Sequence, residues 1–417
     1  MSGPLVRSGS RGLCRGAALT LVFASVLVTA AATGSLPGGE ADPSARGVTH
    51  GSGGPAGPDG PELRSRSVSS TVDRDDVADA AAEAVADGKS GTEAAEEVVS
   101  RSGDRWGAVY DQREYEEFEQ ALDGSYTGVG LSARRAADGR VAVAGVRTGG
   151  PADAAGVRGG DLIRTVDGRP VDGRPVSEVV ALLRGDDRDA VPGSAVVLGL
   201  QRGDRRWSVT PRRTRLSTEP VTVRRLAERK AATVSGAGTP AVLIKVGSFT
   251  RGAGAKVRDA VREAPSGDGI LLDLRGNAGG LVGEAVTAAS AFLDGGLVAT
   301  YDVRGEQRAL YADPGGDTDR PVVVLVDGGT MSAAELLTGA LQDRGRAVTV
   351  GSRTFGKGSV QMPSKLPGGS VAELTVGHYR TPGGRSVDEK GITPDVTVTE
   401  GAQQRAETVL SGLGGGS

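Results

Sequence analysis

Apolar runs alternate with amphipathic stretches along the second half of the chain. Runs rich in Val, Ile and Leu, each of a length suited to one buried strand, occupy residues 241–249, 269–274, 321–326 and 346–351. Stretches with apolar residues at helical spacing lie between them, at residues 255–263 and 281–292. Strands that alternate with helices are typical of α/β folds, so we predict an α/β body over residues 214–402.

A shorter rhythm of strands and turns fills residues 124–213. Strand patterns at residues 141–143, 195–201 and 207–210 accompany an amphipathic helix at residues 176–184. Three motifs of this stretch resemble those of PDZ domains: Pro-Ala-x-x-Ala-Gly at residues 151–156, Gly-Asp-x-Ile at 160–163 and Val-x-Gly at 166–168.

The turn Gly128-Val129-Gly130-Leu131 opens this module. Consecutive backbone N–H groups of such a turn converge on one spot, which can hold the terminal carboxylate of a peptide. The peptide would then pair as an added strand along residues 129–133, beside the helix at residues 176–184. The predicted partner is therefore a polypeptide with a free C-terminus, and we favour an apolar tail.

The region before this module, residues 71–123, is predicted to be helical. Asp76 can cap a first helix that Gly88 ends, and residues 92–99 form a second. A third helix carries Tyr115, Phe118 and Leu122 on one face. We interpret this region as a helical cap without chemistry of its own.

The two ends of the chain have different compositions. Residues 1–34 combine Arg7, Arg11 and Arg15 with an uncharged apolar run and the small residues Ala30-Ala31-Ala32. This pattern is typical of a signal peptide or a signal anchor, and we favour the anchor because a long linker follows. The basic residues before the run place the body outside the cytoplasm.

That linker, residues 35–70, is rich in Gly, Pro and Ser and has almost no large apolar residues, so it is predicted to be disordered. Residues 403–417 are predicted to form a short helix and a flexible glycine end. The localisation that we predict is extracytoplasmic, either anchored to the cell membrane or secreted.

Composition narrows the range of functions. The chain has 417 residues, enough for two or three domains, and a formal net charge of −3, which gives no basic footprint for nucleic acid. Its single cysteine, Cys14, excludes an intrachain disulfide. No group of His, Cys and Asp residues has metal-ligand spacing, so we expect no metal and no cofactor.

The candidate chemistry lies after the apolar run at residues 321–326. Ser332 stands at the start of a predicted helix, where free N–H groups and the helix dipole favour a developing negative charge. A serine hydroxyl needs a base, and Lys357, set between two glycines, can act as one if desolvation leaves it neutral. Gln361 can hold the lysine amine by a hydrogen bond without adding charge.

These residues carry a resemblance to the carboxyl-terminal processing proteases, also called tail-specific proteases, which use a Ser-Lys pair. The family segments match at residues 329–335, 341–347 and 354–361, with departures at Thr330, Met331 and Ala334. The resemblance covers about residues 104–400. It implies an α/β protease core of ClpP/crotonase-like character beside the PDZ domain.

The resemblance also implies roles for single residues. Ser332 would be the nucleophile, Lys357 its general base and Gln361 the residue that orients the base. The oxyanion hole would pair the N–H of Ala333 with that of Gly279 or Gly280, in a turn where Ala278 replaces the usual proline. Asp273 and Arg275 are predicted to form a structural pair, and Glu335 to serve the helix dipole.

Three further hypotheses stay open at this level. A non-catalytic peptide-binding scaffold would keep the same fold. A Ser-His protease would use His378, the histidine of the folded region, because His50 lies in the linker. A mobile PDZ domain could also gate the pair, so that the resting structure holds Ser332 and Lys357 too far apart for a hydrogen bond.

Overall fold

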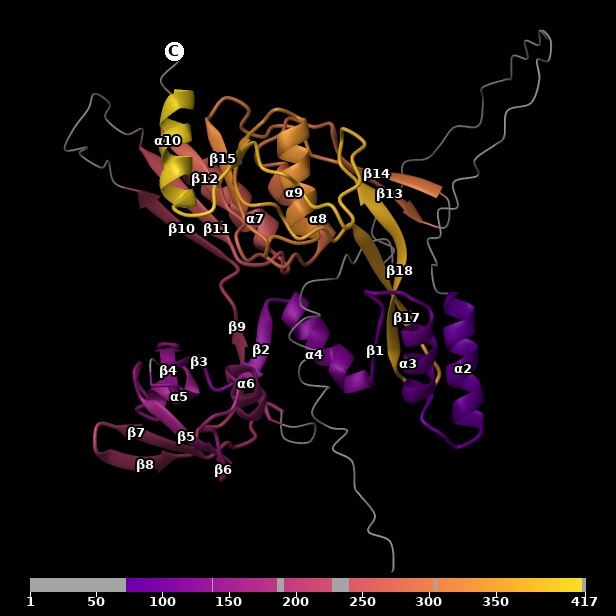
Figure 1. Cartoon of the computed structure of the whole chain (residues 1–417), viewed down its shortest axis with the longest axis vertical. Coiled ribbons are helices and arrows are strands. Elements are labelled where there is room, and N and C mark those ends of the chain that lie inside the picture. The colour runs from indigo at the N-terminus through magenta and orange to yellow at the C-terminus, as the bar shows by residue number, and fades with distance from the viewer. Residues whose placement is uncertain (1–72, 137, 186–190, 227–239, 304–305, 415–417) are drawn as a thin grey trace, which may run out of the picture.

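The computed structural model describes residues 73–136, 138–185, 191–226, 240–303 and 306–414. Three parts are visible in Figure 1: an α/β core at the top, a small β-rich module at the lower left, and the N-terminal helices at the lower right. The predicted export segment and linker, residues 1–34 and 35–70, lie outside the described residues. Within the described ranges, no helix combines the length and the apolar character that a membrane crossing requires.

A six-stranded sheet forms the centre of the core. Its order is β10 (Val221–Leu226), β11 (Ala241–Val246), β12 (Gly269–Asp273), β15 (Val322–Val326), β16 (Val348–Gly351) and β19 (Val396–Thr397). All neighbours pair in parallel except β10 and β11. Every residue of β12 and β15 is buried, as expected for strands covered on both faces. The predicted α/β body is therefore confirmed.

Helices cover both faces of this sheet. On one face lie α7 (Ala253–Glu263), α8 (Val282–Ala289) and α9 (Ala333–Asp343), and on the other lies α10 (Ala402–Gly414). Alternate residues of the strands point to opposite faces: Val324 packs toward α9, and Leu325 packs toward α10. Because parallel strands end at one edge, the turns after β12 and β15 come together there.

A long antiparallel hairpin leaves the core, and the sequence prediction did not include the pairing of its strands. Its strands are β17 (Ser359–Lys365) and β18 (Val371–Arg380), and β18 also pairs with β13 (Leu297–Val303) and with β1 (Ala108–Tyr110). β14 (Glu306–Tyr311) pairs with β13 at the outer edge. Figure 1 shows the hairpin reaching from the core to the N-terminal helices.

The N-terminal helices pack against this hairpin. Apolar side chains of α2 (Arg74–Ala86) and α3 (Gly91–Arg101) form a cluster with Leu366, Ala372 and Leu374. The predicted start of the first helix was wrong, since Asp73 is the N-cap and Asp76 lies in the first turn. α4 (Gln112–Leu122) follows β1 and begins at a reciprocal cap between Asp111 and Glu114.

The smaller module has a β-sheet in the order β3 (Leu131–Arg135), β4 (Val141–Val146), β5 (Leu162–Val166), β7 (Leu198–Arg202) and β8 (Arg205–Val209). Its helices are α5 (Pro151–Ala154) and α6 (Val176–Arg184), and β6 (Arg169–Pro170) pairs with β5. β2 (Ser125–Gly128) pairs with β9 (Thr214–Ser217) at the junction with the core. β3 lies at an edge of the sheet, where an added strand could pair.

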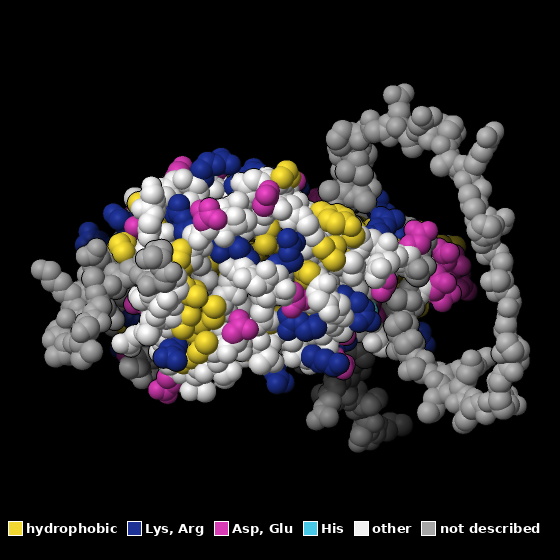
Figure 2. All heavy atoms as spheres, turned by 90° about the horizontal axis from the view of Figure 1, so that it is seen from above, with side chains coloured by type: hydrophobic (Ala, Val, Ile, Leu, Met, Phe, Trp, Pro, Cys, Tyr) yellow, Lys and Arg dark blue, Asp and Glu magenta, His cyan; other side chains and the backbone are white. Residues whose placement is uncertain are grey.

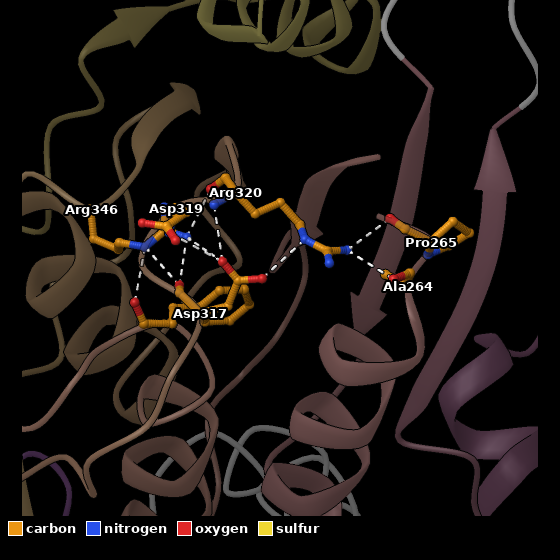
Figure 3. A network of polar contacts seen from close by, with 7 residues as sticks. Ala264, Pro265, Asp317, Asp319, Arg320 and Arg346 are labelled. Atoms are coloured by element: carbon orange, nitrogen blue, oxygen red, sulfur yellow. Dashed lines mark hydrogen bonds and ion pairs between the residues drawn. The ribbon is translucent and has the colours of Figure 1, made fainter. Parts of the chain in front are cut away.

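An arginine network fixes the loop that leads into β15. Arg346 donates to the carbonyl oxygens of Phe292, Asp317 and Arg320 at 2.7 to 2.9 Å. Arg320 in turn donates to the Asp317 carboxylate at 3.0 Å and to the carbonyl of Ala264 at 3.2 Å (Figure 3). These bonds hold the beginning of β15 in place, and β15 leads to Ser332 at its other end.

Basic and acidic side chains are interspersed on the face of the core in Figure 2, without a patch of one sign. This surface agrees with the small net charge of the chain.

Candidate active site

Ser332 is held in a strained backbone conformation between β15 and α9. Its φ is 52° and its ψ is −118°, values that a residue with a side chain rarely adopts. Two bonds hold the turn: the Tyr379 hydroxyl donates to the Ser332 carbonyl at 3.0 Å, and the Met331 N–H donates to the Asn277 carbonyl at 2.9 Å. The Ser332 side chain is fully buried, and its hydroxyl has no hydrogen-bond partner within the described residues. Strain of this kind is common where a fold must present one reactive group.

The glycine turn after β12 lies directly against Ser332. A Cβ built on Gly279 would lie 3.0 Å from the Ser332 Cβ and 3.3 Å from the Ala333 nitrogen. The Gly279 N–H is already used, since it donates to the Asn277 side chain at 2.8 Å. In the described part of the chain, the N–H groups of Gly280 and Ala333 have no acceptor. They are the pair that remains available to an oxyanion.

Lys357 is fully buried between β16 and β17. Burial lowers the pKa of its amine from 10.5 to about 7, against the opposing effect of nearby carboxylates. The flanking glycines allow the backbone to approach closely, since a Cβ on Gly358 would lie 2.7 Å from the Asp388 nitrogen. The Lys357 amine makes no hydrogen bond to any described residue. Ser332 and Lys357 are therefore both buried and are not bonded to each other in this structure.

The Glu335 carboxylate joins the serine turn to the lysine loop. It accepts the N–H of Ser332 at 2.9 Å, that of Gly356 at 2.8 Å and that of Lys357 at 2.9 Å. It also accepts the hydroxyl of Thr354. Burial raises the pKa of Glu335, and these four bonds oppose that rise. The prediction of a simple dipole role was incomplete, because this carboxylate sets the relative position of the two candidate catalytic loops.

The Gln361 side chain is buried near the lysine but does not bond to it in this structure. Its amide donates to Ser359 at 2.9 Å and to Thr375 at 3.2 Å, and its oxygen has no partner among the described residues. The expected hydrogen bond to Lys357 is thus not made in this conformation. The Gln361 amide oxygen and the Lys357 amine are nevertheless both buried and both without a hydrogen-bond partner in the described ranges.

Three other residues singled out in the sequence lie away from the Ser332 hydroxyl or serve the structure. Asp273 and Arg275 form an ion pair at 2.7 Å, as predicted, and Asp273 is buried. His378 lies 3.5 Å from Asp388 and is partly exposed. Its neighbour Tyr379 points to Ser332, and successive side chains of a strand point to opposite faces, so His378 points away from the serine.

Comparisons with known proteins agree with this arrangement. The model of peptidase family S41 matches residues 241–398, and that of the PDZ domain matches residues 143–192. The solved photosystem II D1 C-terminal processing protease has 30% sequence identity with the chain and a TM-score of 0.50, and the alignment covers 77% of this chain and 86% of that one. The chain belongs to peptidase family S41.

Curated relatives of this S41 chain are named as carboxyl-terminal processing enzymes. It is 34% identical over 315 residues to carboxyl-terminal-processing peptidase 2 of Arabidopsis thaliana chloroplasts. It is 31% identical over 304 residues to the carboxy-terminal processing protease CtpA of Bacillus subtilis. Each alignment covers 72% of this chain, and it spans 59% and 62% of the two relatives. These names agree with a family of serine-type peptidases.

One cavity of the S41 chain joins the PDZ groove to the glycine turn. It has a volume of about 490 Å³ and is lined by Gly128 to Ala133, by Val180 and Leu183 of α6, and by Gly279 and Gly280. The predicted peptide-binding residues Gly128, Val129, Gly130 and Leu131 thus share a cavity with the predicted oxyanion turn. Its lining is largely apolar.

Three residues around Lys357 of this S41 chain were missed by sequence reasoning. Trp106 contacts the Lys357 amine, Asp104 bonds to Thr375, and Glu373 is buried on β18. Burial raises the pKa of Glu373 to about 8. All three depend on the pairing of β1 with β18, which joins distant parts of the sequence. The sequence offered one signal for them, the presence of Trp106 and Asp104 in the short loop before β1.

Replacing Gly279 by alanine is expected to lower kcat about 100-fold, because a displaced turn would no longer aim the N–H groups of Gly280 and Ala333 at one oxyanion. The new Cβ would press on Ser332 and Ala333, and the φ of +100° disfavours any side chain. Gly276→Ala is the matched control, because Gly276 lies in the same turn at φ +69° with open space around its Cβ position. Equal kcat values for the two variants would contradict this reading of the turn.

Proposed function

We propose that this chain is a serine endopeptidase that captures the free C-terminus of a polypeptide in its PDZ groove and cleaves upstream of it. The observation that carries the proposal is the shared cavity, which runs from the PDZ edge strand to the turn beside Ser332. A peptide added along β3 would keep its backbone extended in that cavity. Polypeptide substrates outside the cytoplasm are the partners that we propose, with no cofactor.

The reaction follows from the buried pair. The Ser332 hydroxyl attacks the peptide carbonyl while neutral Lys357 takes its proton, and the N–H groups of Gly280 and Ala333 stabilise the oxyanion. Lys357 then gives the proton to the leaving amine, and water hydrolyses the acyl-enzyme by the reverse proton path. A pKa of about 7 leaves a useful fraction of the amine neutral at physiological pH. Gln361 is the residue that we propose to orient the amine.

This chemistry requires the dyad to close. Since neither side chain has a hydrogen-bond partner within the described ranges, the structure corresponds to a state before the Ser332–Lys357 bond forms. Active sites often tighten only when substrate binds. Peptide bound in the cavity would contact the glycine turn itself, which makes substrate the natural trigger for closure.

The Ser-His alternative is disfavoured because His378 points away from Ser332 and pairs with Asp388. The scaffold alternative is disfavoured by the strain at Ser332 and the desolvation of Lys357, since a passive binding module needs neither.

The proposal is tested with a fluorophosphonate probe and with two peptides, one with a free and one with an amidated C-terminus. We expect one adduct, located on Ser332 by mass spectrometry and absent from Ser332→Ala. We also expect preferential cleavage of the peptide with the free carboxylate. Labelling that persists in Lys357→Ala but is lost in His378→Ala would support the Ser-His reading. A wild type that binds both peptides and neither labels nor cleaves would support the scaffold.

We further propose that residues 1–34 direct export and hold the enzyme at the membrane. The basic start and the uncharged run of these residues support this proposal. Determining the N-terminal sequence of the protein purified from its own membranes tests it. A start after Ala32 would show a cleaved signal peptide.

A further inference from the structure

The buried amine of Lys357 contacts one aromatic side chain from the N-terminal region. Its Nζ lies 4.4 Å from the centre of the Trp106 ring. A cation in this position is attracted by the negative face of the indole. Because the amine makes no hydrogen bond to any described residue, the ring face is a direct contact through which its charged form is stabilised.

The loop that carries Trp106 is fastened to the strand next to the dyad. Asp104 accepts the backbone N–H of Trp106 at 3.1 Å, the backbone N–H of Thr375 at 2.8 Å and the Thr375 hydroxyl at 2.8 Å. Thr375 in turn accepts a bond from Gln361 at 3.2 Å. The Trp106 ring also meets Phe355 edge-on, with centroids 5.9 Å apart. The backbone at Trp106 is therefore fastened to β18, and the ring packs against Phe355 of the lysine loop.

We propose that Trp106 is a positioning residue for Lys357: its ring face holds the protonated amine apart from Ser332, and loss of the proton frees the amine to move to the serine. This inference rests on the proposed Ser-Lys function. Two groups could receive the amine, since the Ser332 hydroxyl and the Gln361 oxygen both lack a hydrogen-bond partner among the described residues. The N-terminal region would then take part in the reaction, in contrast to the predicted inert cap.

Other charged groups also act on the amine. The carboxylates that favour its protonated form are Asp104 of the loop before β1, Glu373 of β18, Asp388 of the loop after β18 and Glu335 of α9. The guanidinium of Arg105 lies 4.8 Å from the centre of the same ring and competes for it. All five groups remain when Trp106 alone is replaced. A change in the pKa of the Lys357 amine in that variant therefore reports on the ring.

The first test is the pH profile of kcat/KM. Trp106→Leu keeps an apolar cover but removes the π face, and Trp106→Phe keeps a smaller face. Attraction to the ring favours the charged amine and raises its pKa, so loss of the ring lowers that pKa. The acidic limb should move to lower pH by roughly 0.5 to 1 unit in the leucine variant and by less in the phenylalanine variant. A limb that stays in place while activity falls equally at every pH would overturn the proposal.

The second test needs no activity, so it separates this inference from the proposed function. The chain has two tryptophans, and Trp207→Phe leaves Trp106 as the sole indole emitter. Its emission should change with pH near neutrality as Lys357 loses its charge, and the change should disappear when Lys357→Met is added. An emission that titrates equally with and without Lys357 would overturn the proposal. This fluorescence experiment also tests the contact between Trp106 and Lys357 if the Trp106→Leu variant does not fold.

Discussion

Replacing Lys357 by methionine is expected to abolish cleavage and to stabilise the folded protein below neutral pH. Loss of the general base should lower kcat/KM by a factor of about 10³ or more. Methionine has a similar length and no charge to desolvate, so the buried site keeps its packing. This substitution should therefore change activity and stability in opposite directions.

The sign of the stability effect follows from the two pKa values of the lysine. The unfolded chain takes up the proton below about 10.5, whereas the folded chain takes it up only below about 7. The wild type therefore gains stability as pH rises from 7 to 10.5, and below pH 7 it bears the full cost of a buried charge. Lys357→Met should be more stable than the wild type at pH 6 by a few kcal/mol.

Urea unfolding at pH 6 and pH 9.5 measures this difference. The control is Lys365→Met, since Lys365 lies at the exposed end of β17. The control should leave both the activity and the pH dependence unchanged. Parallel stability curves for the wild type and Lys357→Met would mean that the amine is not desolvated.

Replacing Glu335 by glutamine is the second large effect that we expect. A glutamine would turn an NH₂ group toward backbone N–H groups that now donate to a carboxylate oxygen. Breaking such a buried network should cost about 2 to 4 kcal/mol of unfolding free energy. Because the carboxylate also sets the distance between the serine and lysine loops, kcat should fall about 100-fold.

Glu284→Gln is the matched control for this variant. The Glu284 carboxylate likewise accepts two backbone N–H groups, those of Gly252 at 2.9 Å and Gly254 at 2.8 Å, but it does so at the start of α7. The Glu284→Gln variant should have a lower free energy of unfolding than the wild type. Its rate of fluorophosphonate labelling should be unchanged. If Glu335→Gln labels as fast as Glu284→Gln, the carboxylate has only a structural role.

The parts of the fold that could be predicted were those with a local signal. The buried strands β12 and β15, α6 and the glycine turn each have a pattern within ten or so residues, so their presence could be inferred. The motif at residues 341–347 could be recognised but not explained. In the structure Arg346 fastens the loop before β15, and Gln342 bonds to Asp395 at 3.0 Å, so both act through remote partners.

The parts that could not be predicted depend on distant pairing. β18 reads as a strand in sequence, but nothing local shows that it pairs with β1 or that Glu373 is buried beside Ala108. The contact of Trp106 with Lys357 has the same origin. Serine and lysine could be named from spacing and resemblance, and a resting state without a bond between them was one of the open hypotheses, whereas the packing around the lysine amine is encoded by no short motif.

The pairing of β1 with β18 also has a consequence for biosynthesis. Asp104 and Thr375 are 271 positions apart, and their bonds close one wall of the lysine pocket. A ribosome makes the N-terminal helices first, yet their apolar faces stay uncovered until residues 366–374 have emerged. The wall of the lysine pocket can therefore form only after residue 375 has been synthesised. A chain truncated before residue 366 would lack this wall of the pocket.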